Sequence, residues 1–368
     1  MRRLLITGGA GFIGANFCHY WSTAYPADKL VVLDSLTYAG NLASIQGLIQ
    51  AQRLDFVRGD ICDRDRVLSL IQDQHVDTIV NFAAESHVDR SIEDPQSFLR
   101  TNVMGTHVLL EAARGAWPQA RVDGRYRFHH VSTDEVYGSL GPADPPFTEN
   151  TPYAPNSPYS ASKAAADHVV RAYAHTYGLP CTISNCSNNY GPYQFPEKLL
   201  PLCIVNILEG RPLPVYVDGL QIRDWLHVND HCRAVDLILR ASPAGETWNV
   251  GGGSTEPNIR IVELVCDLVD DEFRQRPELK TCYLRSAAAQ GRSSRSLIQH
   301  VRDRPGHDRR YAVDGGKIAR LGFAATTALR AGLAATVRWY LENEPWWRAI
   351  VTGDYRGWYA RQYPGASA

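Results

Sequence analysis

The sequence has almost no net charge, no long hydrophobic run and no grouped cysteines. Among its 368 residues, 38 basic side chains nearly balance 39 acidic ones, so no global field attracts nucleic acid or an anionic membrane. No apolar run reaches the roughly 20 residues that span a bilayer, and Met1–Thr7 shows no secretory leader pattern. We therefore expect a cytoplasmic protein that has a small-molecule ligand and neither a nucleic-acid nor a membrane partner.

The eight cysteines are scattered, without a Cys-x-x-Cys pair or a histidine at metal-ligand spacing. Such scatter is typical of reduced thiols and predicts no metal site. Lysine is also scarce, with five residues, so Lys198 indicates a specific demand for an ammonium group. Hydrophobic residues make up 44% of the chain, enough for one large domain or two closely joined domains.

The first half alternates short β-type runs with helical patterns. This rhythm predicts an α/β fold, a Rossmann-type doubly wound parallel sheet that binds ligands outside the carboxyl ends of its strands. The expected strands are Leu4–Thr7, Leu30–Asp34, Asp55–Val57, Thr78–Phe82 and Phe128–Val131.

The second half is less regular, with many prolines and short elements. A capping Ser157 followed by Pro158 predicts a helix over 157–177. We expect a Rossmann-type domain over 1–188 and a smaller, mixed substrate-binding region over 189–368 that returns some segments to the first domain. The stretch 285–302, rich in Ala, Ser and Arg, is predicted to be a surface loop.

A glycine motif follows the first expected strand. Gly8, Gly11 and Gly14 form G-x-x-G-x-x-G before an amphipathic helix, a pattern that brings backbone amides and a helix N-terminus to a pyrophosphate. Asp34 ends the second strand, where a carboxylate can accept hydrogen bonds from a ribose and would repel the 2′-phosphate of NADP. The context predicts an NAD site.

Two further motifs supply acid–base groups. Tyr159 and Lys163 are four residues apart on one helix, so the ammonium can favour a phenolate that takes a proton from a hydroxyl. Thr133, Asp134 and Glu135 end the fifth strand, and two carboxyl groups in different surroundings can serve as acid and base. Such a pair suits the elimination of water.

The glycine motif and Tyr-x-x-x-Lys together resemble the extended short-chain dehydrogenase/reductase family. The runs Thr133–Gly138, Ala83–Ser91 and Asn185–Pro192 resemble the dTDP-glucose 4,6-dehydratase family within it. This resemblance implies dehydration of a nucleoside-diphosphate glucose, most closely dTDP-glucose, to a 4-keto-6-deoxy sugar nucleotide. In that reaction Tyr159 removes the 4-hydroxyl proton, Glu135 the carbon-5 proton, and Asp134 protonates the leaving 6-hydroxyl.

The resemblance also implies binding roles. Thr133 would bond the 4-oxygen and Lys163 the nicotinamide ribose. The predicted cofactor-binding residues are Gly8, Gly11, Phe12, Ile13, Gly14, Asp34, Ser35, Leu36, Thr37, Asp60, Ile61, Phe82, Ala83, Ala84, Ser86, Thr101, Tyr159, Lys163 and Asn189. The predicted substrate-binding residues are Ser86, Thr133, Asn188, Lys198, Leu199, Pro214, Val215, Tyr216, Arg223, Asn258, Arg304 and His307.

Several alternatives stay open at this point. A nucleotide-sugar 4-epimerase or a decarboxylase would share the fold, the glycine motif and the Tyr/Lys pair, but neither has a departing hydroxyl that requires Asp134. A non-catalytic dinucleotide-binding protein would lack part of the catalytic set. Ser35 replaces a lysine common in the family, and the long 274–302 segment leaves the preferred base open. A homodimer built from helices near 96–113 and 157–177 is expected from the resemblance.

Overall fold

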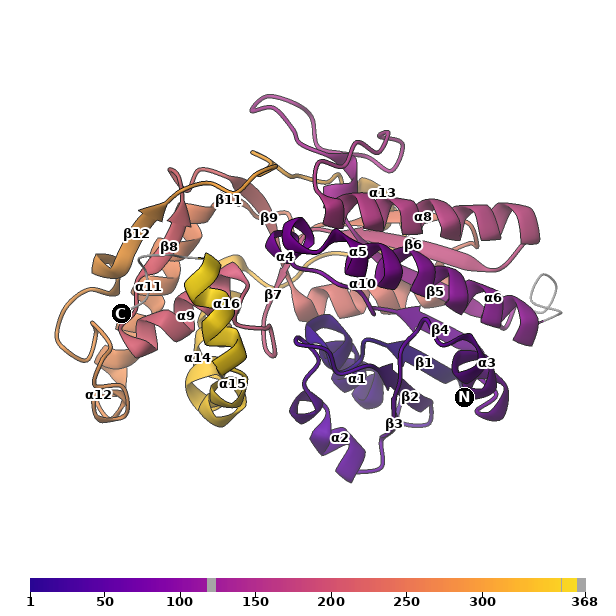
Figure 1. The fold of residues 1–368 in the computed structure, drawn as a ribbon, viewed down its shortest axis with the longest axis horizontal. Coiled ribbons are helices and arrows are strands. Elements are labelled where there is room, and N and C mark those ends of the chain that lie inside the picture. Colours follow the sequence, from indigo (N-terminus) through magenta and orange to yellow (C-terminus); the bar gives the residue numbers. More distant parts are fainter. Residues whose placement is uncertain (118–123, 352, 363–368) are drawn as a thin grey trace.

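Seven parallel strands form the central sheet of the computed structural model, which describes residues 1–117, 124–351 and 353–362. Their order is β10-β6-β5-β4-β1-β2-β3, so β1 lies between β2 and β4 where the strand order reverses (Figure 1). The strands are β1 (Arg3–Thr7), β2 (Lys29–Asp34), β3 (Leu54–Arg58), β4 (Thr78–Asn81), β5 (Arg127–Thr133), β6 (Cys181–Cys186) and β10 (Thr247–Val250).

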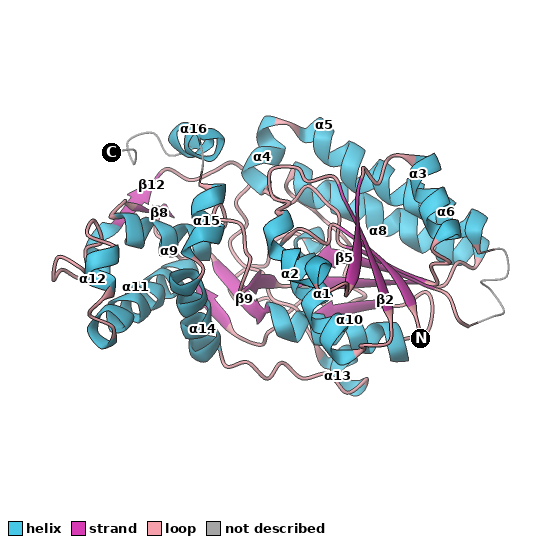
Figure 2. Cartoon of the chain, turned by 90° about the horizontal axis from the view of Figure 1, so that it is seen from below, coloured by secondary structure: helices cyan, strands magenta, loops and turns pink. Residues whose placement is uncertain are grey.

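Helices cover both faces of this sheet, which is why the inner strands are continuous apolar runs. One face packs against α1 (Phe12–Ala24) and α10 (Val228–Ala241) through an apolar cluster that includes Phe17 and Val235. The other face packs against α3 (Arg64–Asp73), α6 (Thr106–Ala116) and α8 (Pro158–Tyr177). Figure 2 shows the strands enclosed by these helices. The predicted Rossmann-type fold is confirmed.

Short elements connect these layers near the strand ends. The first group follows β2 and β4, and a π-helical stretch, η2, leads directly into α6. The bounds are η1 (Leu42–Ser44), α2 (Gln46–Gln50), α4 (Val88–Glu93), α5 (Pro95–Phe98), η2 (Leu99–Gly105), η3 (Asp134–Tyr137) and α13 (Gly316–Arg320).

A second, smaller body of helices and strands lies beside the sheet, with its own apolar core. Its strands form a three-stranded sheet, β11-β9-β7, and a parallel pair, β12-β8. The bounds are β7 (Asn188–Tyr190), α9 (Leu199–Glu209), β8 (Leu213–Tyr216), β9 (Ile222–His227), β11 (Thr255–Pro257), α11 (Asn258–Gln275), α12 (Leu279–Cys282), η4 (Ser294–Leu297), β12 (Ile298–Val301), α14 (Leu329–Glu342), α15 (Glu344–Ile350) and α16 (Gly353–Gln362).

One element prediction is wrong. The stretch 285–302 is not simply a surface loop, because it contains η4 and β12, and β12 pairs with β8 in the register Gln299↔Pro214 and His300↔Val215. Backbone hydrogen bonds to a distant strand do not require an apolar run, so the Ala/Ser/Arg composition concealed the strand. The predicted helix over 157–177 is confirmed as α8, capped by Ser157. No helix among the described residues is long and apolar enough to cross a membrane.

Candidate active site

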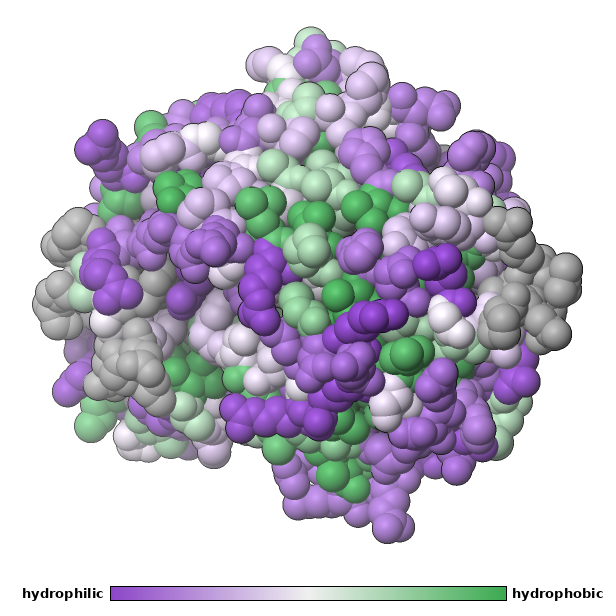
Figure 3. Space-filling view, turned by 45° about the vertical axis from the view of Figure 1, so that its right-hand side comes forward, coloured by the Kyte–Doolittle hydropathy of each residue, from purple (hydrophilic) through white to green (hydrophobic). Residues whose placement is uncertain are grey.

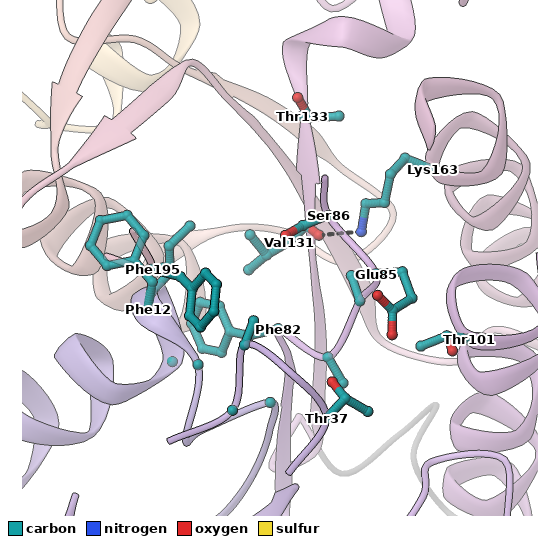
Figure 4. Close-up of a pocket in the computed structure, with 18 of the residues that line it drawn as sticks. Phe12, Thr37, Phe82, Glu85, Ser86, Thr101, Val131, Thr133, Lys163 and Phe195 are labelled. Atoms are coloured by element: carbon teal, nitrogen blue, oxygen red, sulfur yellow. Dashed lines mark hydrogen bonds between the residues drawn. The ribbon is translucent and has the colours of Figure 1, made fainter. Parts of the chain in front are cut away.

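A cavity of about 460 Å³ opens at the carboxyl ends of the central strands. Its walls come from the segments after β1, β2, β4 and β5, from α8 and from residues 186–198. Figure 4 shows Phe12, Phe82 and Phe195 on one side, Lys163 on the other and Thr37 below them. Every predicted cofactor-binding residue except Leu36 lines this cavity.

The glycines at the end of β1 allow three backbone segments to approach one another closely. A Cβ atom on Gly14 would lie 2.3 Å from the carbonyl oxygen of Gly8. A Cβ on Gly8, whose φ is +68°, would lie 2.6 Å from the amide nitrogen of Ala83. Only glycine permits this approach of the turn, helix α1 and the segment after β4. The first amides of α1 are thereby left facing the cavity, as a pyrophosphate requires.

Asp34 ends β2 and holds the loop that follows. Its Oδ2 accepts a hydrogen bond from the amide of Ala10 at 2.9 Å, and its Oδ1 accepts one from Leu36 at 2.8 Å. Each oxygen keeps a further lone pair for a ribose hydroxyl. Leu36 has φ 54° and acts through this backbone contact, whereas Ser35 and Thr37 line the cavity. These acceptor positions on Asp34 fit an adenine dinucleotide that has a free 2′-hydroxyl.

The catalytic candidates converge from two elements. Thr133 ends β5 and its hydroxyl accepts a hydrogen bond from the amide of Glu135 at 3.3 Å, which starts η3 and turns Asp134 and Glu135 into the cavity. On α8, the reciprocal Ser157–Ser160 cap fixes the helix start just before Tyr159. Thr133, Asp134, Glu135, Tyr159 and Lys163 all line the same cavity.

The two acids have different surroundings. Asp134 is 1% exposed and its Oδ2 has no hydrogen-bond partner. Burial, reinforced by the charge of Glu135, raises the pKa of Asp134 well above its ordinary value. Burial also raises the pKa of Glu135, but the positive charges of Arg304, Lys198 and Arg223 oppose that rise. Asp134 is therefore suited to hold a proton and Glu135 to accept one.

Tyr159 and Lys163 form the other half of the site. Burial and the charge of Glu135 raise the pKa of the Tyr159 phenol well above its ordinary value, while a hydrogen bond with Thr133 lowers it. Lys163 Nζ donates to the carbonyl oxygen of Val131 at 2.8 Å, the bond drawn in Figure 4. Burial lowers the pKa of Lys163 to about 8. The Tyr159 phenol is therefore protonated in this environment, and a nearby cation is needed to favour its phenolate.

The predicted substrate-binding residues fall into two groups. Ser86, Thr133, Asn188 and Lys198 line the cavity, and Lys198 Nζ donates to the carbonyl oxygen of Ser86 at 2.6 Å. The others lie outside its lining: Leu199, Pro214, Val215, Tyr216, Arg223, Asn258, Arg304 and His307.

Most of that outer group lies in the second body. Val215 is 2% exposed and belongs to its apolar core. Tyr216 and Arg304 both hold the carboxylate of Asp89, at 3.2 and 3.0 Å. Arg223 lies 4.2 Å above the ring of Tyr311.

Sequence reasoning missed several residues of the site. Glu85 lines the cavity and stands within the Ala83–Ser91 run, so the run itself could have indicated it. Arg100 also lines the cavity and pairs with Asp60 at 2.8 Å. The π-helical turn of η2 places it there, and no sequence pattern shows such a turn. Other lining residues missed include Ala39, Gly40, Ser97, Ser132, Cys186, Ser187, Gln194, Phe195 and Glu197.

The titratable groups of the site do not gather into a metal-ligand set. In the described part of the chain, no cluster of three or more His, Cys, Asp or Glu side chains could hold a metal ion.

Comparisons with known proteins find sugar-nucleotide 4,6-dehydratases. A model of the GDP-mannose 4,6 dehydratase family matches residues 5–336. The dTDP-glucose 4,6-dehydratase of Xanthomonas campestris pv. campestris (strain B100) is 52% identical over 360 residues, covering 97% of this chain and 98% of the relative. That of Neisseria meningitidis serogroup B is 49% identical, with the same two shares covered. The chain belongs to the dTDP-glucose 4,6-dehydratase family.

Solved structures separate this family from its neighbours. The dTDP-glucose 4,6-dehydratase of Streptomyces venezuelae, with NAD and TYD bound, has a TM-score of 0.83 at 46% identity and covers 95% of this chain and 99% of its own. The UDP-glucose 4-epimerase of Thermus thermophilus, in complex with NAD, has a TM-score of 0.78 at 26% identity, covering 93% and 99%. Epimerases share the fold, but the dehydratases share nearly twice as much sequence.

Proposed function

We propose that this member of the family is an NAD-dependent hydro-lyase that converts dTDP-glucose into the 4-keto-6-deoxy sugar nucleotide and water. The observation that carries the proposal is the adjacent acid pair, in which Asp134 is buried with no hydrogen-bond partner at Oδ2 while three cations act on Glu135. One neutral carboxylic acid beside one carboxylate is what an elimination needs. Family membership supports the same reaction.

The residues divide the work by atom. Tyr159 removes the proton of the sugar 4-hydroxyl, and Thr133 holds the resulting 4-oxygen. Glu135 then takes the proton from carbon 5, next to the new ketone, and Asp134 protonates the 6-hydroxyl as it leaves as water. NAD+ bound in the cavity supplies a ring that takes hydride from carbon 4 and returns it to carbon 6, so none is consumed overall.

NAD and the sugar nucleotide bind at opposite ends of the site. The glycine turn and Asp34 hold the dinucleotide, and Lys163 holds the nicotinamide ribose. Lys198, Arg223 and Arg304 supply positive charge for the diphosphate, with β8 beside the base. These contacts define two functional parts, 1–188 for cofactor and catalysis and 189–368 mainly for the sugar nucleotide.

Product analysis tests the reaction. The purified chain is incubated with dTDP-glucose, UDP-glucose, UDP-glucuronate and GDP-mannose, and the products are separated by chromatography and identified by mass spectrometry. We expect the loss of one water from dTDP-glucose, with the other substrates turned over more slowly. A 4-epimer of unchanged mass, or carbon dioxide released from a glucuronate, would replace the proposal with one of its alternatives. No turnover with NAD fully bound would favour a non-catalytic role.

We further propose a homodimer in the cytoplasm, with α5, η2, α6 and α8 at the contact. Support comes from Leu99 and Met104, which are 52% and 54% exposed on η2. Figure 3 shows apolar residues gathered among polar ones on the side that carries α5 and α8. Burying them in a second copy removes apolar surface from water. The variant Leu99→Glu/Met104→Glu should run as a monomer in light scattering, and an unchanged dimer would exclude this contact.

A further inference from the structure

A buried carboxylate lies behind the Tyr/Lys pair. Asp167 follows Lys163 by one turn of α8, is fully buried and does not line the cavity. Its Oδ2 accepts hydrogen bonds from Ser132 Oγ and from the Tyr153 hydroxyl, both at 2.9 Å. Its Oδ1 has no hydrogen-bond partner. A half-satisfied buried carboxylate is costly, so it calls for a function.

His130 stands between this carboxylate and the catalytic lysine. Its Nε2 lies 3.5 Å from Asp167 Oδ1 and 3.3 Å from Lys163 Nζ. Burial and the charge of Lys163 lower the pKa of His130 well below its ordinary value, so the ring is neutral. One Nε2 atom cannot both donate to a carboxylate and accept from an ammonium. The ring alone therefore cannot connect the two groups by hydrogen bonds, and Asp167 and Lys163 must also attract each other electrostatically.

From this arrangement we propose that Asp167 is a positioning residue for the dehydratase reaction, whose buried charge keeps Lys163 an ammonium aimed at the cavity. The carbonyl oxygen of Val131 and the ring of His130 fix where Nζ lies, and Asp167 keeps it cationic there. The inference rests on the proposed function, in which the Lys163 cation supports the Tyr159 phenolate.

The charges around the pair define the pH range in which it is ionised. Burial lowers the pKa of Lys163 to about 8, although Asp167 on the same helix and Cys186 on β6 raise it. Burial raises the pKa of Asp167 to about 6, against the lowering effects of Lys163, Ser132, Tyr153 and Arg171. Both groups are therefore charged between about pH 6 and pH 8. Without Asp167, Cys186 would be the one remaining group of the two whose charges raise the pKa of Lys163.

The parent enzyme provides the first test. With NAD bound, lysine labelled with ¹³C at Cε is titrated by NMR, and the small number of lysines allows the Lys163 signal to be assigned by its absence in Lys163→Met. We expect two inflections for Lys163, its own near pH 8 and a smaller one near pH 6 from Asp167. A single inflection at the ordinary lysine value would overturn the proposal.

Variants provide the second test. Asp167→Asn should lower the pKa of Lys163 by about one unit or more, a tenfold loss of ammonium per unit above that pKa, and move the alkaline limb of the kcat profile down equally. Tyr153→Phe, the matched control, removes one of the two hydrogen bonds that the Asp167 carboxylate accepts but keeps its charge, so the Lys163 titration should stay within a few tenths of a unit. Equal Lys163 titrations in the parent and Asp167→Asn would overturn the proposal.

These readouts separate the inference from the reaction it serves. The titration needs no substrate, so a chain that fails to dehydrate dTDP-glucose yet shows the two inflections would refute the proposed function alone. If Asp167→Asn does not fold, the parent titration decides by itself.

Discussion

At the scale of single residues, the site works by giving neighbouring side chains different protonation. Asp134 and Glu135 are adjacent in sequence, with Asp134 buried and Glu135 half-buried, and three cations act on Glu135, while for Asp134 burial and the charge of Glu135 dominate. This separation of roles is the physical basis for assigning an acid and a base. It also predicts how each substitution fails.

Asp134→Asn should retain oxidation at carbon 4 but lose the proton donor for the departing hydroxyl. We expect kcat for dehydration to fall by about 10²- to 10⁴-fold, the range that general acid catalysis contributes. Single-turnover absorbance of bound NADH should show that the cofactor is still reduced. Glu135→Gln should behave similarly because its amide cannot take the carbon-5 proton. An Asp134→Asn enzyme with parental turnover would exclude this residue as the acid.

The protonation of Glu135 sets the acid limb of activity. Its pKa is raised above the ordinary 4.5, so the carboxylate, and with it kcat/KM, is lost as the pH falls through that raised value. Arg304→Gln removes the strongest opposing charge, and the limb should move up by about one unit. Arg309→Gln, which breaks an exposed ion pair with Asp218, is the control and should leave the limb in place. If the acid limb stays at the same pH in both variants, a group other than Glu135 is responsible for it.

At the scale of secondary-structure elements, local sequence patterns were sufficient to predict those elements that are stabilised by their own residues. The strand ends, the glycine turn and the Ser157 cap of α8 could be predicted because apolar runs and caps are local signals. The strand β12 could not, since it exists through pairing with β8, some 85 positions earlier in the chain. The π-helical turn of η2, which delivers Arg100 and Thr101, is likewise set by packing against α8.

The turn between β1 and α1 gives a sharp test at this scale. Gly14→Ala places a Cβ within 2.3 Å of the Gly8 carbonyl, so the turn must shift. We expect a loss of about 1–3 kcal/mol in unfolding free energy, as in other overpacked sites, and little bound NAD after purification. Gly47→Ala in α2, where no atom lies within 4 Å, should be neutral or slightly stabilising. Full NAD content in Gly14→Ala would show that the cradle tolerates the methyl group.

At the scale of the whole molecule, the catalytic half of the site was open to prediction and the substrate half was less so. The glycine turn, Asp34 and the Thr133–Glu135 acids stand at strand ends, where topology brings them together, and Tyr159 and Lys163 follow from the local pattern of α8. Tyr216 and Arg304 meet at Asp89 only because three distant segments fold onto one another. Contacts of this kind carry no local pattern.

One such long-range contact ties the two parts of the chain at the rim of the cavity. The Arg90 guanidinium lies 3.8 Å above the ring of Tyr38, from the loop after β2, and its Nε donates to Glu197 at 2.9 Å. The ring of Phe195 meets that of Tyr38 edge-on at 5.6 Å. Phe195 and Glu197 also line the cavity. The contact therefore joins the second body to the first at the edge of the cofactor site.

An enzyme that reuses its cofactor within each turnover gains from slow release, and we expect the Arg90 contact to slow the release of NAD. Arg90→Met removes the charge and the stacking, so bound NAD should dissociate about 10-fold faster or more, since the loss of a largely buried ion pair and a cation–π contact exceeds 1.4 kcal/mol. Stopped-flow displacement by labelled NAD measures that rate. Arg260→Met, which breaks an exposed ion pair on α11, is the control and should leave the rate unchanged. Equal rates in both variants would mean that the glycine turn and Asp34 retain NAD without help from the second body.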